Sequence, residues 1–451
     1  MLLLTQIGCG GLSTRPAAPA APASSPSPAT TPSPALSADW PEYHGSSART
    51  GVGPAVPSMG SPVRAWSAHL DGDVYASPLI VAGHVIAATE NNTVYSLDLF
   101  TGALVWKAQL GQPVESGSLP CGDVGPVTGI TGTPAADPGS GRLYVVAFLR
   151  THHHMLFTLS LTDGSVLAQQ DVDPAGSDPS VEQERGALAV GPDFVYVPFG
   201  GLFGDCGLYP GYVVAVPRRR GAILSYRVPS ARGAGIWSPA GVTVGSDGGI
   251  YVATGNGASE SAFDFSNSVV ELAPDLQAVR SYFAPANWSS LNASDTDLGS
   301  AGVAVLPSLG VVLAIGKQGT AYVLKAGSLG GIGGQLASTH ACAGSVGGTA
   351  SSGSTVYIPC SDGLYALSVT AGSVAVAWRA ARPVLGSPIL AAGAVWAIDP
   401  GSAMLYALDP SSGAVRYSTY LGSSEHFSTP AATEGFIVAP AAQSVVAVST
   451  G

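Results

Sequence analysis

Five residues in the middle of the chain could together bind and transform a small molecule. Trp237 lies in GIWSPAG, Asn256 in ATGNG, Asp297 in DTDLGS and Lys317 in AIGKQG, and Asp205 lies in the earlier segment FGDCG. Side-chain oxygens such as those of Asn256 and Asp297 suit a hard cation, and a carboxylate can remove a proton as a general base. The flat face of a tryptophan can hold a planar ring. These residues can share a site only if the fold brings them together.

The elements that would position them are short apolar strands that recur in pairs. Eight times, a run of β-branched and aromatic residues is followed, after a polar turn, by a second such run. The first runs are VIAAT (85–89), LYVVAF (143–148), VYVPF (195–199), IYVAT (250–254), VVLAIG (311–316), VYIPC (356–360), VWAID (395–399) and FIVAP (436–440). With no helical pattern between them, these repeats predict an all-β fold, an eight-bladed β-propeller with four antiparallel strands, a to d, in each blade.

The eighth copy is too short to supply all four of its strands. It ends at the point where the other copies have reached only the turn before strand d. Residues 63–70, VRAWSAHL, are similar to strand d of the first blade, LVWKAQL at 104–110, with Trp66 in the place of Trp106. We therefore expect the N-terminal strand 63–70 to complete the last blade and close the ring, which leaves no free sheet edge there.

This topology predicts that the five residues lie on one face of the ring. Because the strands of a blade run alternately up and down, the d–a and b–c connections share a face. Trp237 opens strand a of blade four and Asp297 opens blade five, and Asn256 and Lys317 close strands b of the same blades. Asp205 lies in the b–c connection of blade three. We expect all five near one mouth of the central channel, although turn capping alone also explains Asn256 and Asp297.

Four cysteines map to the same face. Cys121 and Cys342 precede strands a, and Cys206 and Cys360 lie at or after the ends of strands b. We predict disulfides Cys342–Cys360 within blade six and Cys121–Cys206 between blades two and three, and an oxidising compartment. The alternative is that they are buried thiols. No CxxC spacing is present, which argues against a zinc site or haem attachment.

Composition limits the partners. Charged residues make up only 10% of the 451 residues, and the formal net charge is −11. Without a basic stripe, nucleic-acid binding is excluded, and an anionic membrane is an equally poor direct partner. The run Arg218-Arg219-Arg220 falls in a c–d turn on the opposite rim, where a solvated turn is expected, and His152-His153-His154 cannot converge on one metal from a single strand. We expect a monomer that takes a small molecule or a protein at the channel face.

The N-terminus predicts a location outside the cytoplasm. MLLLTQIGCGG is too short to span a bilayer, and Cys9 follows Gly8 directly. Residues 10–38 are rich in Pro, Ala and Ser and should form a disordered tether. A small residue, a cysteine and a tether resemble a bacterial lipoprotein, although Gln6 and the missing basic start depart from its signal. We therefore expect a signal-peptide remnant at 1–9 with lipidation at Cys9, or alternatively ordinary secretion, and a propeller at 39–451.

The repeats LYALDPSSGAV and VYSLDLFTGALVW resemble the pyrroloquinoline-quinone (PQQ) propeller repeat. Quinoprotein alcohol dehydrogenases and non-enzymatic outer-membrane assembly propellers share it, and the resemblance runs from about residue 40 to the end. The segments GDCG, ATGNG, DLGS and GGTA are similar to those of a bacterial group of secreted or lipid-anchored propellers.

The segments YVATGN and DTDLGS resemble the cofactor region of the dehydrogenases. This resemblance implies that Trp237 stacks on the quinone, Asn256 binds calcium, Asp297 is the general base and Lys317 contacts the quinone. Asp205 lies nearest to the position of the calcium-binding Glu, so the implied metal ligands are Asn256, Asp297 and Asp205. The adjacent cysteine pair and the CxxCH haem motif of those enzymes are absent.

Two functions follow from these expectations. The first is an extracytoplasmic binding module for a small ligand or a protein. The second is a PQQ- and calcium-dependent dehydrogenase that oxidises an alcohol or sugar with Asp297 as base. The fold alone carries no activity, so the sequence leaves the enzyme assignment open.

Overall fold

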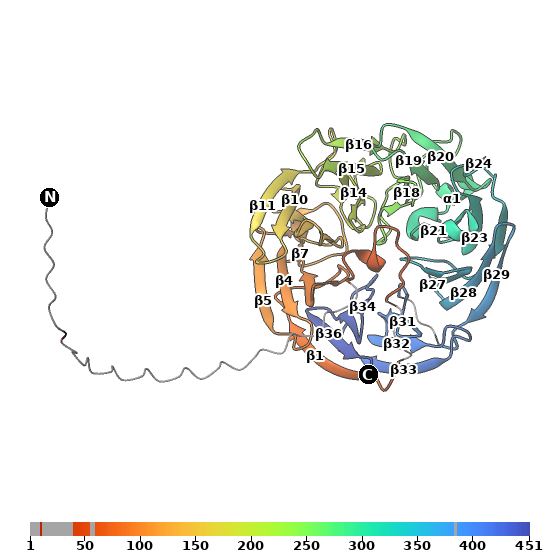
Figure 1. The fold of residues 1–451 in the computed structure, drawn as a ribbon. Coiled ribbons are helices and arrows are strands. Elements are labelled where there is room, and N and C mark those ends of the chain that lie inside the picture. Colours follow the sequence, from red (N-terminus) through yellow and green to blue (C-terminus); the bar gives the residue numbers. More distant parts are fainter. Residues whose placement is uncertain (1–9, 11–38, 55–58, 383–385) are drawn as a thin grey trace, which may run out of the picture. The chain divides into compact units, whose positions relative to one another are not determined.

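The computed structural model describes residue 10 and residues 39–54, 59–382 and 386–451. Cys9, the segment 1–9 and nearly all of the predicted tether 10–38 lie outside the described residues. Apart from one two-stranded sheet, the strands of the described part form eight sheets around a central axis (Figure 1). The predicted eight-bladed propeller is therefore confirmed.

Each blade is an antiparallel sheet whose strands a to d follow one another from the centre outward. In blades one to four the strands are β2 (Leu79–Val81), β3 (His84–Ala88), β4 (Thr93–Asp98), β5 (Leu104–Gln109); β8 (Ala135–Asp137), β9 (Arg142–Leu149), β10 (His153–Ser160), β11 (Val166–Asp171); β13 (Ala189–Val190), β14 (Phe194–Gly201), β15 (Tyr212–Pro217), β16 (Leu224–Arg227); and β17 (Thr243–Val244), β18 (Ile250–Ala253), β19 (Val269–Leu272), β20 (Val279–Ala284). In blades five to eight they are β21 (Ala304–Leu306), β22 (Val311–Ala314), β23 (Thr320–Lys325), β25 (Ala337–His340); β26 (Ala350–Ser352), β27 (Thr355–Cys360), β28 (Gly363–Thr370), β29 (Ser373–Arg379); β30 (Ile389–Ala391), β31 (Ala394–Asp399), β32 (Met404–Leu408), β33 (Val415–Tyr420); and β34 (Ala431–Thr433), β35 (Phe436–Pro440), β36 (Ser444–Ser449), β1 (Val63–His69).

A few short strands and helical turns supplement the four strands of each blade. The strand β12 (Glu182–Gln183) pairs with β14, β24 (Gly331–Ile332) joins β20 in parallel, and β6 (Val114–Glu115) pairs with β7 (Val127–Thr128). The helical turns are η1 (Tyr43–Gly45), η2 (Ser116–Ser118), η3 (Leu298–Ser300), η4 (Pro307–Leu309) and α1 (Trp288–Ala293). In the described part of the chain, no helix is long and apolar enough to cross a bilayer.

The N-terminal strand closes the ring, as predicted. β1 pairs antiparallel with β36, from Val63 opposite Ser449 to His69 opposite Ser444. The Trp66 indole N–H donates to the Leu99 carbonyl of blade one at 2.7 Å. β1 therefore completes blade eight and also fastens it to blade one.

The contact made by Trp66 recurs around the ring. Trp66, Trp106 and Trp378 each donate the indole N–H to a carbonyl in the c–d turn of the next blade. Each ring also covers a glycine of that turn, respectively Gly102, Gly164 and Gly413. All three glycines have positive φ, and a Cβ on any of them would come within 2.6 Å of the indole. Only glycine fits at these positions. The hydrogen bond and the ring contact together hold each tryptophan's blade against the next one.

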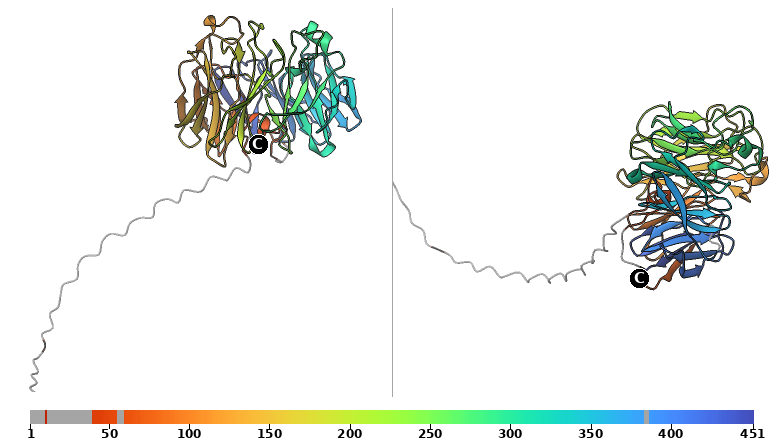
Figure 2. Two further views of the ribbon diagram at one scale, coloured as in Figure 1. Left: turned by 90° about the horizontal axis from the view of Figure 1, so that it is seen from above. Right: turned by 90° about the vertical axis from the view of Figure 1, so that its right-hand side faces the viewer.

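One end of the central channel is filled by the chain itself. Residues 40–53, here called the plug, cross the centre of the ring, and η1 lies within them (Figures 1 and 2). Backbone hydrogen bonds join the plug to the inner strands of several blades. They include Trp40 with Ile80 of blade one, Ser47 with Val244 of blade four, Thr50 with Ser351 of blade six and Gly53 with Leu390 of blade seven. The sequence did not predict this segment, because it has no strand periodicity.

Arg49 is the main polar anchor of the plug. Its buried guanidinium donates to the carbonyls of Leu188 at 2.6 Å and Val242 at 3.0 Å, in blades three and four. It also pairs with Glu42 at 3.4 Å. Burial raises the pKa of Glu42 to about 7, although Arg49 opposes the shift. The plug is thus bound to the blades by a buried, charge-assisted network.

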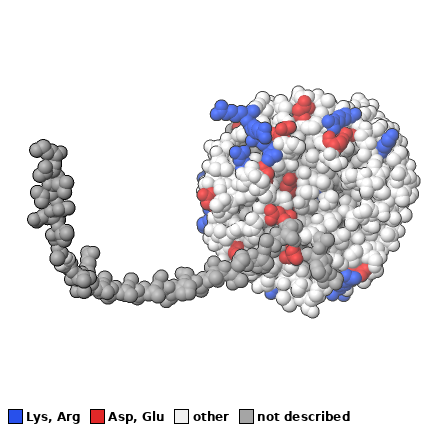
Figure 3. Space-filling model, in the orientation of Figure 1, with Lys and Arg blue, Asp and Glu red and all other residues white. Residues whose placement is uncertain are grey.

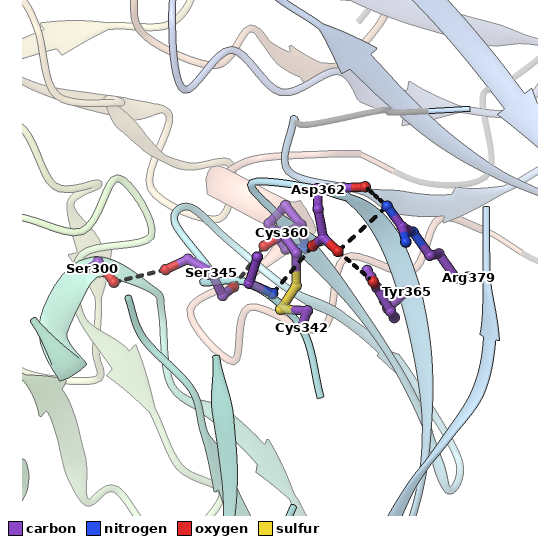
Figure 4. The surroundings of a disulfide bond; sticks show 9 residues. Ser300, Cys342, Ser345, Cys360, Asp362, Tyr365 and Arg379 are labelled. Atoms are coloured by element: carbon purple, nitrogen blue, oxygen red, sulfur yellow. Dashed lines mark hydrogen bonds and ion pairs between the residues drawn. A yellow bond between two sulfur atoms is a disulfide. The ribbon is translucent and has the colours of Figure 1, made fainter. Parts of the chain in front are cut away.

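Both predicted disulfides are present, Cys121–Cys206 and Cys342–Cys360. The alternative of buried thiols is therefore wrong. Figure 4 shows the second disulfide beside Asp362. The Asp362 carboxylate accepts from the Ala343 N–H at 3.2 Å and the Tyr365 hydroxyl at 2.7 Å. The disulfide and Asp362 together tie the b–c hairpin of blade six to the connection that precedes its strand a.

Buried carboxyl groups brace neighbouring blades near the channel. Glu90, after strand b of blade one, accepts from the Gly129 N–H at 2.6 Å and the Thr131 hydroxyl at 3.2 Å, both before strand a of blade two. Its second oxygen has no hydrogen-bond partner in the described structure. Burial raises the pKa of Glu90 from 4.5 to about 7, because the charged form is poorly solvated there.

Glu90→Gln is therefore expected to change how stability depends on pH. A carboxyl whose pKa is higher in the folded state binds more protons when folded, so stability falls as pH rises from about 4.5 to about 7. A shift of this size corresponds to about 3 kcal/mol. The variant should match the parent near pH 4.5 and exceed its free energy of unfolding at pH 8, measured by urea denaturation. The exposed Glu115→Gln serves as control, and equal pH profiles for the parent and Glu90→Gln would refute the expectation.

Candidate functional site

The five residues singled out from the sequence surround a single cavity at the channel mouth. The cavity has a volume of about 580 Å³, and Asp205, Trp237, Asn256, Asp297 and Lys317 all line it. Because they precede strands a or follow strands b, they lie on the face opposite to the a–b turns. The topological expectation about their location is thus met, whereas their chemical roles remain predictions.

Short backbone contacts within blade four and within blade five hold these side chains. Trp237 precedes β17, and the nearby Gly235 carbonyl accepts from the Gly255 N–H at 2.9 Å. Asp297 directly precedes η3, and its carbonyl accepts from the Lys317 N–H at 2.8 Å. Position 255 requires glycine, because a Cβ there would lie only 2.5 Å from an oxygen of the Asp297 carboxylate.

Asp297 forms the most strongly paired group of the cavity. Its buried carboxylate accepts from the Asn256 N–H at 2.7 Å and lies 2.5 Å from the Lys317 ammonium group. Burial alone would lower the pKa of Lys317, but the charges of Asp297 and Asp295 outweigh it and raise that pKa. Lys317 therefore stays protonated. Asp297 does not cap its own turn; it joins blade four to blade five.

Aromatic side chains form one wall of the cavity. Trp237 is half-buried, and the Lys317 nitrogen lies 5.6 Å from the centre of its ring, within the range of a cation–π contact. The Phe427 ring lies 6.3 Å from Trp237 at an interplanar angle of 51°. Trp237 is thus neither sealed in the core nor free in solvent, and its ring borders the cavity.

Sequence reasoning missed a second group of lining residues. Arg185 pairs with Asp123 at 2.8 Å and donates to the His426 ring at 3.0 Å. Burial, together with the Arg185 charge, lowers the pKa of His426, which favours the neutral ring. Asp123, Arg185 and His426 come from the connections between blades one and two, two and three, and seven and eight, respectively. No local motif marks them, and a count of polar residues before strands a is the only signal that could have found them.

The disulfide Cys121–Cys206 connects two segments that line the same cavity. Asp205, next to Cys206, accepts a hydrogen bond from the Tyr209 hydroxyl, and Asp123 lies two residues after Cys121. Burial, followed by the contact with Asp205, raises the pKa of Tyr209. The disulfide therefore joins two segments that carry cavity-lining side chains.

The pairing of the lining carboxylates disfavours a calcium ion in the cavity. In the described ranges, His, Cys, Asp or Glu ligands gather in threes only at Cys342, Cys360 and Asp362 and at His153, Asp171 and Asp173, away from this cavity. The first set contains a disulfide. Asp297 is already paired with Lys317, and Asp205 is bonded to Tyr209. An ion beside Asp297 would have to displace the Lys317 ammonium group or tolerate its charge.

Comparisons with known proteins agree with the repeat assignment. Residues 61–198, less than half of the chain, match the family model described as outer membrane protein assembly factor BamB. No curated protein sequence matches the chain significantly. The chain is built from the PQQ-like β-propeller repeat.

Solved structures share the architecture at low sequence identity. The quinohemoprotein alcohol dehydrogenase ADHIIG from Pseudomonas putida HK5 is 14% identical with a TM-score of 0.74, over 92% of this chain and 80% of that one. A europium-containing methanol dehydrogenase is 16% identical with a TM-score of 0.70, over 89% of each chain. BamB from Moraxella catarrhalis is 13% identical with a TM-score of 0.58, over 86% of this chain and 100% of that one. At these identities the similarity shows the fold alone.

Proposed function

We propose that this propeller is an extracytoplasmic binding module that takes a small ligand at the channel mouth. The observation that carries the proposal is the 580 Å³ cavity, in which aromatic and charged side chains from several blades converge. The plug lies beneath it, since Tyr43 and Phe427 border a common small cavity. A ligand that enters from the open face meets the plug at the bottom of the cavity. The channel mouth is therefore a closed pocket and not a passage through the ring.

The charges of the cavity favour a neutral or cationic ligand. Four carboxylates line it (Asp123, Asp205, Asp295 and Asp297) against the two cations Arg185 and Lys317. Both cations are paired with these carboxylates. The Trp237 ring supplies an apolar surface for a flat group. A planar ligand with a positive charge suits this set better than a quinone that carries several carboxylates.

The two disulfides support a location outside the cytoplasm, where such bonds persist. Within the proposal, Cys9 carries a lipid anchor, and the Pro/Ala/Ser-rich segment 10–38 spaces the propeller from the membrane. A protein partner could use the same mouth, because Phe203 at its rim is 65% exposed.

Trp237→Ala is expected to weaken ligand binding at the mouth by at least about tenfold. Tryptamine and indole-3-acetate are suitable probes, because they share a ring and differ in charge. Calorimetry should show tryptamine binding roughly tenfold more tightly, since the cavity is net negative. Trp288→Ala, at a half-buried tryptophan of α1 outside the cavity, is the matched control. Equal affinities for both probes, or equal losses in both variants, would contradict the proposal.

The PQQ-dependent dehydrogenase is the second candidate, because Trp237, Asp297 and Lys317 do border one cavity. Its test is titration of the protein with PQQ and calcium, followed by absorbance and calorimetry. Stoichiometric quinone binding, together with dye-linked alcohol oxidation that Asp297→Ala abolishes, would establish the dehydrogenase and overturn the binding module. Absence of quinone binding under conditions where tryptamine binds would exclude it.

A further inference from the structure

A second recess lies between blades two and three on the plug face, and four arginines line it. This arginine groove has a volume of about 380 Å³ and is bordered by Arg142, Arg218, Arg219 and Arg220, with Leu167 and Tyr144 in its walls. Figure 3 shows the cluster of basic side chains near the upper left of this face, where Figure 1 places β11 and β15. The groove is on the face opposite to the cavity at the channel mouth.

The groove exists because the outer strand of blade three starts late. In β15 and β16 the last paired residues are Ala215 and Leu224. Val216 and Pro217 therefore have no partner in β16, and the turn that carries the arginines projects beside them. Across the gap, Leu167 on the outer strand β11 of blade two is 54% exposed. The sequence predicted only a solvated turn at this place.

Positive charge is concentrated in the groove, and in the described part of the chain most of it is not paired with a carboxylate. The whole chain has 18 Lys and Arg residues against 29 Asp and Glu, and four of the 18 meet here. Arg218 has a structural role, because it pairs with Asp137 and donates to the Gly191 carbonyl at 2.9 Å. Arg219 and Arg220 are exposed and have no hydrogen-bond or ion-pair partner among the described residues.

A buried donor inside the groove is also without an acceptor. Tyr144 is only 4% exposed, and its hydroxyl lies beside the Arg218 guanidinium but makes no hydrogen bond of ordinary geometry. The hydroxyl itself is inaccessible, so Tyr144 forms the floor of the groove beneath Arg218. The groove thus combines free cations with an exposed apolar side chain.

We propose that the arginine groove binds an extended acidic segment of a partner protein. Carboxylates on the segment pair with Arg219 and Arg220, and intervening apolar side chains contact Leu167. A lipid surface fits less well, because Tyr144 is recessed and a flat bilayer would reach only the projecting arginines. The chain itself shows that the outer edge of a blade accepts another strand, since β24 adds to β20 of blade four.

Fluorescence anisotropy with a labelled peptide of alternating Asp and Leu tests this proposal on the full chain. The peptide should bind in a salt-dependent manner, and Arg219→Glu/Arg220→Glu should weaken it at least about tenfold. The matched control is Arg64→Glu/Lys107→Glu, which makes the same charge change at exposed positions of β1 and β5. Leu167→Asp should also weaken binding, because it adds a negative charge to the groove wall.

The outcomes separate the proposal from its alternatives. If the glutamate pair fails to fold, Arg219→Ala/Arg220→Ala replaces it, with thermal unfolding as the check. Equal losses in the groove and control variants would show non-specific electrostatics and overturn the proposal. Binding of phosphatidylglycerol vesicles without binding of the Asp–Leu peptide would assign the groove to lipid and overturn it as well. Neither result bears on ligand binding at the channel mouth.

Discussion

Replacing residues 64–70 with a Gly/Ser sequence of equal length is expected to abolish cooperative folding of the propeller. β1 supplies the outer strand of blade eight, and its Trp66 locks that blade to blade one. Without β1, the edge of β36 is unpaired and the ring is open between its first and last blades. The loss exceeds that of any single contact, because neighbouring blades stabilise one another around the closed circle. The measurement is calorimetric and urea-induced unfolding.

The replacement leaves the plug in place, which a simple N-terminal truncation would not do. As the matched control, residues 64–70 are replaced by LVWKAQL, the sequence of the equivalent strand at 104–110. This variant keeps a strand and the tryptophan and should unfold in one transition. Trp66→Ala alone should cost roughly 3–5 kcal/mol. A Gly/Ser variant that unfolds in one transition at the parent's midpoint would disprove closure by β1.

Arg49→Met should destabilise the protein by about 3–5 kcal/mol, because it breaks a buried ion pair and leaves several carbonyls without donors. Arg49 is 4% exposed and joins the plug to Leu188 and Val242 of blades three and four. Methionine keeps most of the volume, so the loss reports on polar contacts. Urea denaturation at pH 7 gives the free energy of unfolding.

The double variant Arg49→Met/Glu42→Gln tests the cause of that loss. Glu42 would otherwise remain buried beside an absent partner, so removing its charge should recover part of the stability. Glu42→Gln alone should have a smaller effect, since Arg49 keeps its carbonyl acceptors. If Arg49→Met costs less than about 1 kcal/mol, then the plug is not a structural part of the ring.

The architecture could be predicted from the sequence, because its signals are local. Alternating apolar runs and the turns between them define the blades, and the short eighth copy requires a strand from elsewhere. Once up-and-down strands are assumed, the connections sort onto two rims. That rule placed Cys121 with Cys206 and brought Trp237, Asn256, Asp297 and Lys317 to one mouth. These inferences need only chain order and strand direction.

What the sequence could not supply depends on distances across the ring. The plug has no periodicity, and its hydrogen bonds reach inner strands up to hundreds of residues away, as from Gly53 to Leu390. Whether Asp297 faces a metal or pairs with Lys317 is decided by a separation of 2.5 Å, which no motif encodes. Likewise, Arg219 became part of a groove only because β16 begins at Leu224. The local sequence pattern therefore determined the blades. Packing around the ring decided which contacts are made by the side chains in the connections between them.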